Sequence, residues 1–272
     1  MNETVSEKGD NKREGGQTSS RAILSEQISE GLNELTRPSS GLFLSALSAG
    51  LDIGFGPLLM AVFITLGAGT LGEPVESILL ANAYAVGFVF VVLGRSELFT
   101  EHTTMAVLPV LDGKATLAQL GRLWGLIYAG NMVGAFVFAA IAATAAPSYG
   151  IADASAFATI ATKLLDHSAW GLFTGAVLAG WLMGLLSWLV AAAQETISRL
   201  VFVWLVAATI GIAGLPHSIA GTVEVLGGLI LVPELGVVDF LRFLALSTVG
   251  NALGGSVFVG LLKYGHVVRG GS

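Results

Sequence analysis

Two polar interruptions of long apolar runs carry the residues of this sequence that could do chemistry. His217 lies in GLPHSIAG, inside the apolar run 200–232, and Thr100 lies in ELFTEHTT, inside an apolar segment that begins near residue 78. An imidazole, whose unperturbed pKa is about 6.5, can donate a hydrogen bond to an anion or exchange a proton with it near neutral pH. A hydroxyl can accept or donate a second hydrogen bond. Together they predict a polar site for a small anion.

His217 has a functional and a structural interpretation. It lies inside a predicted membrane span, where an ionisable side chain is costly to bury without a role or a partner. Gly214 and Pro216 place it at a helix break, which a bilayer tolerates only where the freed backbone groups are buried in protein or line a polar cavity. We therefore favour a functional role. The alternative is a histidine that bonds to a neighbouring backbone carbonyl and only holds the break.

Thr100 also has two interpretations. The N-terminus of a half-helix presents unpaired backbone N–H groups and the positive end of its dipole, so a hydroxyl there can take part in binding an anion. The alternative is that Thr100 only caps a half-helix that begins at Glu101. Leu98 and Phe99 beside it are either hydrophobic gates against hydrated ions or ordinary core or lipid-facing residues, and the sequence favours neither.

The composition identifies the class of protein that must hold these residues. Of 272 residues, 54% are hydrophobic and 12% are charged, about half the charged share of a soluble domain. The absence of cysteine excludes disulfides and cysteine-based metal or iron–sulfur sites. A net charge of -6 gives no electrostatic reason to expect nucleic-acid binding. We expect an all-α membrane protein in a lipid bilayer, with no metal and no cofactor.

Long apolar segments supply the elements that position the two polar sites. There are six of them, at residues 41–68, 78–111, 117–145, 169–193, 200–231 and 240–262. Each exceeds the roughly 20 residues that a helix needs to span the hydrocarbon core. The second and the fifth are the longest, as expected of helices with a non-helical break, and one broken helix in each half of a chain indicates a permeation site near the membrane midplane.

The remaining sequence divides into one channel domain and two tails. Residues 1–38 form a tail whose segment 21–35 has apolar residues at helical spacing, which is typical of an amphipathic helix on the membrane or packed on the protein itself. A six-helix channel domain covers 39–265 and a short tail covers 266–272. Because most lysines and arginines lie in the tails and in the loops after the second and fourth segments, we expect both termini to be cytoplasmic.

An internal repeat relates the two halves of the channel domain. Residues of the first segment match residues of the fourth at identical spacing, namely Gly41, Ala46, Gly50 and Gly54 with Gly171, Ala176, Gly180 and Gly184. The third and sixth segments match through Gly130, Asn131 and Gly134 with Gly250, Asn251 and Gly254. Halves with three crossings each must lie in opposite orientations, so two inverted three-helix repeats with an aquaporin-like architecture are predicted. For most of the glycines we favour a packing role.

Three further charged residues have open interpretations. Lys163, in the external loop before the fourth segment, either attracts anions into a vestibule or is an ordinary solvated lysine. Asp52 and Arg95 lie inside predicted spans. They form either a buried pair, because opposite charges in a low-dielectric interior need partners, or two separate side chains that reach an interface.

These features together resemble the formate/nitrite transporter family. The motifs are Glu97-Leu-Phe-Thr at the first break, His217-Ser-Ile-Ala at the second and Gly250-Asn-x-x-Gly-Gly in the sixth segment, and the likeness covers residues 41 to about 264. The chain departs from the usual pattern at Pro216, where an acid is common, and at Gly221, where Asn is common. These departures suggest a divergent branch.

The resemblance implies a homopentamer in which each protomer has its own pore for formate, nitrite, hydrosulfide or a similar small monovalent anion, often with a proton. It also implies a role for each of the residues near the breaks. Thr100 and His217 form the central pair, Leu98 and Phe99 belong to a constriction, Glu97 steadies the break, and Lys163 lies near the vestibule.

The predicted function is therefore a cell-membrane channel or transporter for small monovalent anions of weak acids, proton-coupled through the central histidine or passive. One alternative is a neutral small-solute channel, against which the lack of paired Asn-Pro-Ala motifs counts. Another is a membrane enzyme that uses His217 and Glu224, although no His-Glu-x-x-His or Gly-x-Ser-x-Gly motif is present. We expect no catalytic activity.

Overall fold

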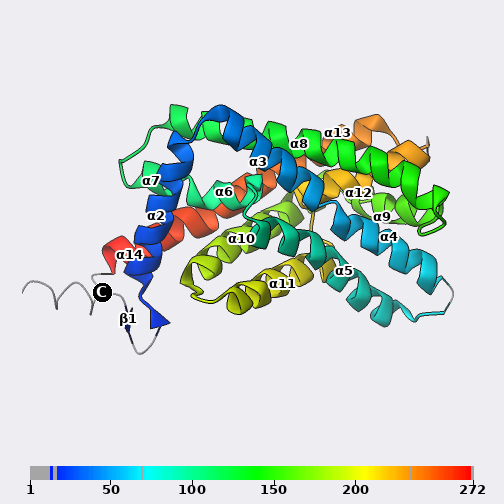
Figure 1. Cartoon of the computed structure of the whole chain (residues 1–272), viewed down its shortest axis with the longest axis horizontal. Helices are drawn as coiled ribbons and strands as arrows, with labels where there is room; N and C mark the ends of the chain where they lie inside the picture. The colour runs from blue at the N-terminus through cyan, green and yellow to red at the C-terminus, as the bar shows by residue number, and fades with distance from the viewer. Residues whose placement is uncertain (1–12, 15–16, 69, 233, 271–272) are drawn as a thin grey trace, which may run out of the picture.

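The computed structural model describes residues 13–14, 17–68, 70–232 and 234–270, and this part of the chain is almost entirely helical (Figure 1). Two strands of two residues each, β1 (Arg13–Glu14) and β2 (Gln17–Thr18), pair antiparallel before the first helix. The predicted all-α class is confirmed. Residues 1–12 and 271–272 of the predicted tails lie outside the described residues.

Five of the described helical stretches are long and apolar enough to cross a membrane. The first joins α3 (Ser39–Asp52) and α4 (Phe55–Gly67), and the next three are α5 (Glu73–Gly94), α8 (Leu117–Ser148) and α10 (Ala169–Ala192). The last joins α13 (Val237–Leu253), the π-helix η1 (Gly254–Leu261) and α14 (Leu262–Arg269), so it runs beyond the predicted domain boundary at residue 265. The fifth predicted segment forms two shorter apolar helices, α11 (Thr196–Ile212) and α12 (Ser218–Leu231).

Both predicted breaks are present, but each is shorter than its motif. After α5 the chain resumes as α6 (Phe99–Met105) and α7 (Leu108–Leu111), so the first break covers residues 95–98. The second covers residues 213–217, between α11 and α12. Arg95 has a left-handed φ of 56° and Gly214 one of 60°, a conformation that glycine adopts freely and arginine rarely. A further interruption that the sequence analysis did not predict separates α3 from α4.

The matched glycines of the repeat lie where two pairs of helices pack closely. Helix α3 packs against α8, and α10 packs in the same way against α13 and η1. A Cβ atom added to Gly50 would collide with the backbone carbonyl of Asn131, and one added to Gly180 would collide with that of Asn251. Equivalent positions of the two halves therefore make equivalent contacts, which agrees with a packing role for these small residues.

The predicted amphipathic segment is α2 (Ser20–Thr36), and it packs on the protein itself. Its residues Ile23, Leu24 and Ile28 are buried in a cluster with Trp188 and Val267. Figure 1 shows α2 at one end of the molecule beside α14, and α9 (Ala154–Leu165) toward the other end. We refer to these two ends as the α2 side and the α9 side.

Helix α9 is a correction to the sequence interpretation, which placed Lys163 in a loop. The segment is helical because its apolar residues Phe157, Ile160, Ala161 and Leu164 recur at helical spacing and are buried. They pack against α12. A helix of 12 residues is too short to span a bilayer. A search for apolar segments of membrane-spanning length therefore does not detect it.

Candidate functional site

The two breaks bring Thr100 and His217 into direct contact. Thr100 Oγ1 and His217 Nε2 are 2.8 Å apart and form a hydrogen bond between residues that are 117 positions apart in the sequence. Both side chains are buried, with exposed fractions of 0% for Thr100 and 1% for His217. The edge of the Phe88 ring packs against the imidazole, with 5.1 Å between ring centroids. A hydroxyl and an imidazole thus meet where both broken helices have their gaps.

The hydrogen bonds of His217 indicate which of its nitrogens carries a proton. The backbone N–H of Ala220 donates to Nδ1 over 3.2 Å, so this nitrogen must offer a lone pair. The neutral imidazole then has its hydrogen on Nε2, which donates to Thr100 Oγ1. His217 also caps the N-terminus of α12 through this bond. The bond to a backbone carbonyl, which the structural interpretation of His217 proposed, is replaced by this bond from a backbone N–H, and the cap leaves Nε2–H to face Thr100.

Thr100 does not cap the second half-helix. Helix α6 begins at Phe99, with Leu98 as its N-cap residue, so Thr100 lies within the first turn rather than before it. The Phe99 N–H is satisfied by the side chain of Asn131, with 2.8 Å between N and Oδ1. The Thr100 hydroxyl is thereby left available for His217.

Two asparagines hold the breaks in the same way. In the first half, Asn131 Oδ1 accepts from Phe99 N–H, and its Nδ2 donates to the carbonyl oxygens of Ala46 over 2.7 Å and Glu97 over 2.8 Å. In the second half, Asn251 Oδ1 accepts from Ser218 N–H over 2.8 Å, and its Nδ2 donates to the carbonyl oxygens of Ala176 over 2.8 Å and Pro216 over 3.0 Å. Each amide thus replaces hydrogen bonds that the interrupted helix has lost.

Neither asparagine is among the predicted site residues, although both belong to the predicted repeat. The signal that identifies them is an amide at the same position of two apolar spans, because a buried amide needs several partners and an unbroken helix offers few. Their bonds also align the two breaks: Glu97, Leu98 and Phe99 in the first half correspond to Pro216, His217 and Ser218 in the second.

Leu98 and Phe99 are core residues of the single chain. Leu98 has an exposed fraction of 0% and Phe99 one of 4%, so neither faces lipid. The Phe99 ring makes edge contacts with Tyr128 and Trp124 of α8, with centroids 5.0 and 5.8 Å apart. Both residues belong to the buried cluster that also contains Phe88 and Ile219. They directly precede Thr100 in the sequence.

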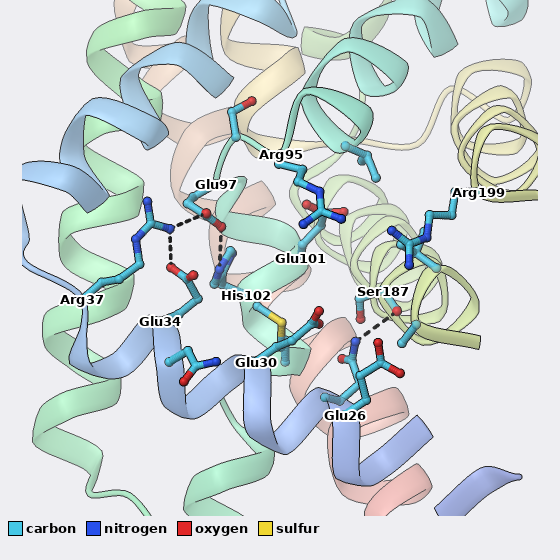
Figure 2. Close-up of a pocket in the computed structure, with 17 residues that line it drawn as sticks. Glu26, Glu30, Glu34, Arg37, Arg95, Glu97, Glu101, His102, Ser187 and Arg199 are labelled. Atoms are coloured by element: carbon cyan, nitrogen blue, oxygen red, sulfur yellow. Dashed lines mark hydrogen bonds and ion pairs between the residues drawn. The ribbon is translucent and has the colours of Figure 1, made fainter. Parts of the chain in front are cut away.

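A cavity of about 380 Å³ lies on the α2 side of this contact. Its charged lining residues are Glu26, Glu30, Glu34, Arg37, Arg95, Glu97, Glu101, His102 and Arg199 (Figure 2). Burial raises the pKa of Glu30 and of Glu34 above the usual value of a carboxyl, and the acidic neighbours Glu26 and Glu97, respectively, raise it further. Many charged side chains of both signs therefore line the cavity next to the first break.

Glu97 connects the first break to α2. Its carboxylate accepts from Arg37 Nη1 over 2.7 Å and lies 3.1 Å from His102 Nε2, while Arg37 Nη1 also donates to Glu34 over 2.7 Å (Figure 2). Its backbone N–H donates to Ser45 Oγ over 3.3 Å. The ligand atoms of Glu34, Glu97 and His102 lie within 4.8 Å of one another, close enough to hold a metal ion. His102 is not a predicted site residue, although its position within ELFTEHTT is a sequence signal.

Of the two interpretations of Asp52 and Arg95, the buried pair is not present among the described residues. Asp52 accepts from Ser48 of its own helix over 3.0 Å. Arg95 ends α5 and lines the cavity on the α2 side, and the described residues contain no ion pair between the two. The reason is that α5 ends at Gly94, so Arg95 follows the helix and reaches a polar cavity where its charge needs no single buried partner.

A second cavity, of about 300 Å³, lies on the α9 side. Lys163 and the buried Glu224 line it together with Glu73, Glu76 and Tyr84. Gly214 lines it as well, so the second break is accessible from this cavity. Lys163 and Glu224 are brought together here, whereas His217 is not among the residues that line this cavity.

The comparisons with known proteins concern the family and the fold. A family model described as formate/nitrite transporter matches residues 21–265. The chain is 32% identical over 245 residues to the inner membrane protein YfdC of Escherichia coli (strain K12), covering 88% of this chain and 76% of that protein.

Two solved structures share the fold. An FNT family ion channel has a TM-score of 0.78 at 23% identity, covering 89% of this chain and 97% of the other. A pentameric formate channel with formate bound has a TM-score of 0.71 at 24% identity, covering 85% of this chain and 98% of the other. These structures confirm the predicted aquaporin-like fold class of broken membrane helices. The family model spans nearly the whole described chain, and the chain belongs to the formate/nitrite transporter family.

Proposed function

We propose that the chain is a membrane channel or transporter for small monovalent anions of weak acids, such as formate, nitrite or hydrosulfide, and that Thr100 and His217 form its central site. The observation that carries this proposal is the 2.8 Å hydrogen bond between two buried polar side chains at the meeting point of two broken helices. Membership of the formate/nitrite transporter family supports the class of substrate. Each protomer of a homopentamer provides its own path, as the likeness to a pentameric formate channel suggests.

The path runs between the two cavities. On the α9 side, the ammonium group of Lys163 attracts the anion toward the second break. Leu98 and Phe99 form the apolar constriction, which hydrated ions cross at a high cost. Glu97 holds the first break open toward the α2 side. The distribution of lysine and arginine supports a cytoplasmic α2 side with both termini in the cytoplasm.

The neutral imidazole of His217 orients the site. Because Nε2–H donates to Thr100 Oγ1, the hydroxyl hydrogen of Thr100 is free to point at an anion. Passage as the neutral acid requires one more step. Protonation of Nδ1 by a proton taken up from solvent would break the bond from Ala220 N–H, and the Nε2 proton would then pass through the Thr100 hydroxyl to the anion, which leaves a neutral imidazole with its hydrogen on Nδ1. Return of that hydrogen to Nε2 re-forms the bond from Ala220 N–H and resets the site. This step makes His217 a relay for one proton per anion.

The proposal assigns no catalytic residue to the chain. The enzyme alternative needs His217 and Glu224 in one site, but Glu224 lines the α9-side cavity and His217 does not. The two functions also differ in what they would leave behind: a transporter moves its substrate unchanged, whereas an enzyme would convert it.

Anion flux into liposomes that contain the purified protein tests the proposal. Formate, nitrite, hydrosulfide, acetate and chloride would be compared across a pH series, beside Thr100→Val, which keeps the shape and removes the hydroxyl, and Thr100→Ser as its matched control. We expect selective, pH-dependent flux that Thr100→Val reduces and Thr100→Ser keeps. Absence of flux for all of these anions from folded, assembled protein would contradict the proposal, and swelling of the same liposomes in glycerol would favour a neutral-solute channel instead.

A further inference from the structure

The side chains of Glu34, Glu97 and His102 form a cluster with the geometry of a metal site. They come from three different elements: α2, the first break and α6. One ligand atom of each lies within 4.8 Å of the other two. Ligand atoms bound 2.0–2.2 Å from one Zn²⁺ ion lie roughly 3 to 4 Å from one another, so small side-chain rotations are enough to bring these three onto one ion.

The imidazole of His102 is already oriented as a metal ligand. Its ring is buried, with an exposed fraction of 1%, and Nδ1 lies 3.0 Å from the carbonyl oxygen of Leu98. A carbonyl only accepts hydrogen bonds, so Nδ1 carries a hydrogen. Nε2 faces the carboxylate of Glu97, and it would offer its lone pair to a metal ion on giving up its proton. Metal-bound histidines commonly donate the other ring N–H to a backbone carbonyl in this way.

His102 Nε2 has no well-aligned hydrogen bond within the described part of the chain. It lies 3.1 Å from Glu97 Oε2, but it makes no hydrogen bond of acceptable geometry with that atom or with another described residue. With a proton on Nε2 the contact is an ion pair of poor alignment, and a divalent cation that displaces this proton would bind both atoms. A buried ring nitrogen without a well-aligned hydrogen bond is the observation that distinguishes the cluster from an ordinary group of acidic residues.

The surrounding charge favours a cation. Five glutamates but only three arginines line the cavity that contains the cluster. Arg37 now occupies the position between the two carboxylates, with Nη1 2.7 Å from a carboxylate oxygen of Glu34 and 2.7 Å from one of Glu97 (Figure 2). Its side chain is 34% exposed, so it can turn outward to solvent. A guanidinium can only donate hydrogen bonds and cannot bind the lone pair of His102, whereas a metal ion would bind all three ligands.

We propose that Glu34, Glu97 and His102 bind a divalent transition-metal ion, with Zn²⁺ as the cation that matches one imidazole and two carboxylates, and that the ion replaces Arg37 between the carboxylates. A metal at this position cross-links α2 to the first break. It also fixes the ring that holds the carbonyl of Leu98, next to Phe99 and Thr100. A consequence for transport, namely slower anion flux in the metal-bound protein, rests on the function proposed above.

Calorimetric titration of the purified full-length protein with Zn²⁺ tests the site without measuring transport. We expect one ion per chain, and we expect His102→Gln and Glu34→Gln each to weaken binding by at least about tenfold. Arg37→Gln should strengthen binding by about fivefold, because it removes a half-exposed ion pair that competes with the metal. The matched controls are Glu30→Gln, on the same helix and in the same cavity, and the exposed His266→Gln, both of which should bind Zn²⁺ like the natural chain.

The arginine variant separates a metal site from a purely structural cluster. A structural role for Arg37 predicts no gain of Zn²⁺ affinity in Arg37→Gln, and that result together with unchanged binding by Glu34→Gln would overturn the proposal. Binding of Mg²⁺ as tight as that of Zn²⁺ would also contradict it, since an imidazole ligand disfavours Mg²⁺. Thermal unfolding and gel filtration of each variant identify any that fail to fold. Failure of every protein to pass anions would refute the proposed function while the titration still decides the site.

Discussion

Replacing Asn251 by leucine should destabilise the protein strongly, because the amide of Asn251 satisfies backbone groups that have no other partner. The bonds at stake are those from Ser218 N–H over 2.8 Å and to the carbonyl of Pro216 over 3.0 Å. Both groups lie in or beside the second break, where the described residues offer them no second hydrogen bond. The third bond, to the carbonyl of Ala176, is less important because that residue lies within α10 and keeps its helical environment.

The expected magnitude follows from these two groups. Leaving one buried donor or acceptor unsatisfied costs about 1–3 kcal/mol, so Asn251→Leu should lose about 2–6 kcal/mol. A matched control is Asn82→Leu, because Asn82 also makes two side-chain hydrogen bonds, to Ile78 of its own helix and from Trp204, but lies exposed on the surface of the single chain. We expect its loss to stay below about 1 kcal/mol, as for a typical hydrogen bond that water or lipid headgroups can replace.

The assay compares the two variants in the same detergent. Unfolding would be followed by denaturant titration, and the assembled fraction by gel filtration. Anion flux would be measured on the material that remains assembled. We expect Asn251→Leu to be far less stable and to lose flux, since the break that holds His217 would no longer be supported. A loss for Asn251→Leu no larger than that for Asn82→Leu would refute the reasoning that the amide supports the break.

Three further outcomes are expected. Gly180→Ala should destabilise the protein by about 1–3 kcal/mol in thermal or denaturant unfolding, because the new Cβ would collide with the α13 backbone; Gly41→Ala, which has open space around it, should be neutral. Thr100→Val should lower anion flux by about tenfold, the value of one hydrogen bond of about 1.4 kcal/mol, while Thr100→Ser keeps most of it. The packing of α2 on the rest of the protein should become more stable as pH falls. Burial raises the pKa of Glu30 above 4.5, so the docked state binds the carboxyl proton of Glu30 more tightly than the undocked state does. This stabilisation is complete below pH 4.5 and is lost as pH rises through the raised pKa. Hydrogen exchange of α2 amides at several pH values would measure it, and Glu30→Gln should flatten the profile.

Much of the fold can be predicted from the sequence because bilayers require long apolar helices and leave few other choices. The position of the second break also follows from a local signal, since Pro216 lacks the N–H that a helix interior needs and Gly214 precedes it by two residues. The ends of the breaks cannot be predicted in the same way. Helix α6 begins at Phe99 because Asn131, 32 residues away, receives the Phe99 N–H, and no local pattern records that contact. The left-handed Arg95 that ends α5 likewise has no sequence signal.

The candidate site also has some features that the sequence predicts and others that it does not. Thr100 and His217 are identifiable because a hydroxyl and an ionisable ring are unusual inside apolar runs. Their contact with each other depends on the tertiary structure and cannot be predicted from the sequence. The same holds for Asp52 and Arg95, because the sequence does not show how deep in the membrane each charge lies or which way its side chain points. The cluster of Glu34, Glu97 and His102 joins a surface helix to a membrane break. Distances along the chain alone could not bring these residues together.

The equivalent bonds of Asn131 and Asn251 have an evolutionary consequence. They place Leu98 and His217 at corresponding positions of the two halves, although one side chain is apolar and the other is an imidazole. A chain that arose by duplication of a three-helix ancestor would have begun with the same residue at both positions. Because the amides bond only to backbone groups of each break, both positions could diverge while these bonds stayed intact, and the cap that His217 provides to Ala220 N–H is an addition in the second half. Such a duplication therefore allows different side chains to appear at equivalent positions while the two halves keep the same backbone arrangement. Leu98 and His217 mark one position at which the two halves became specialised.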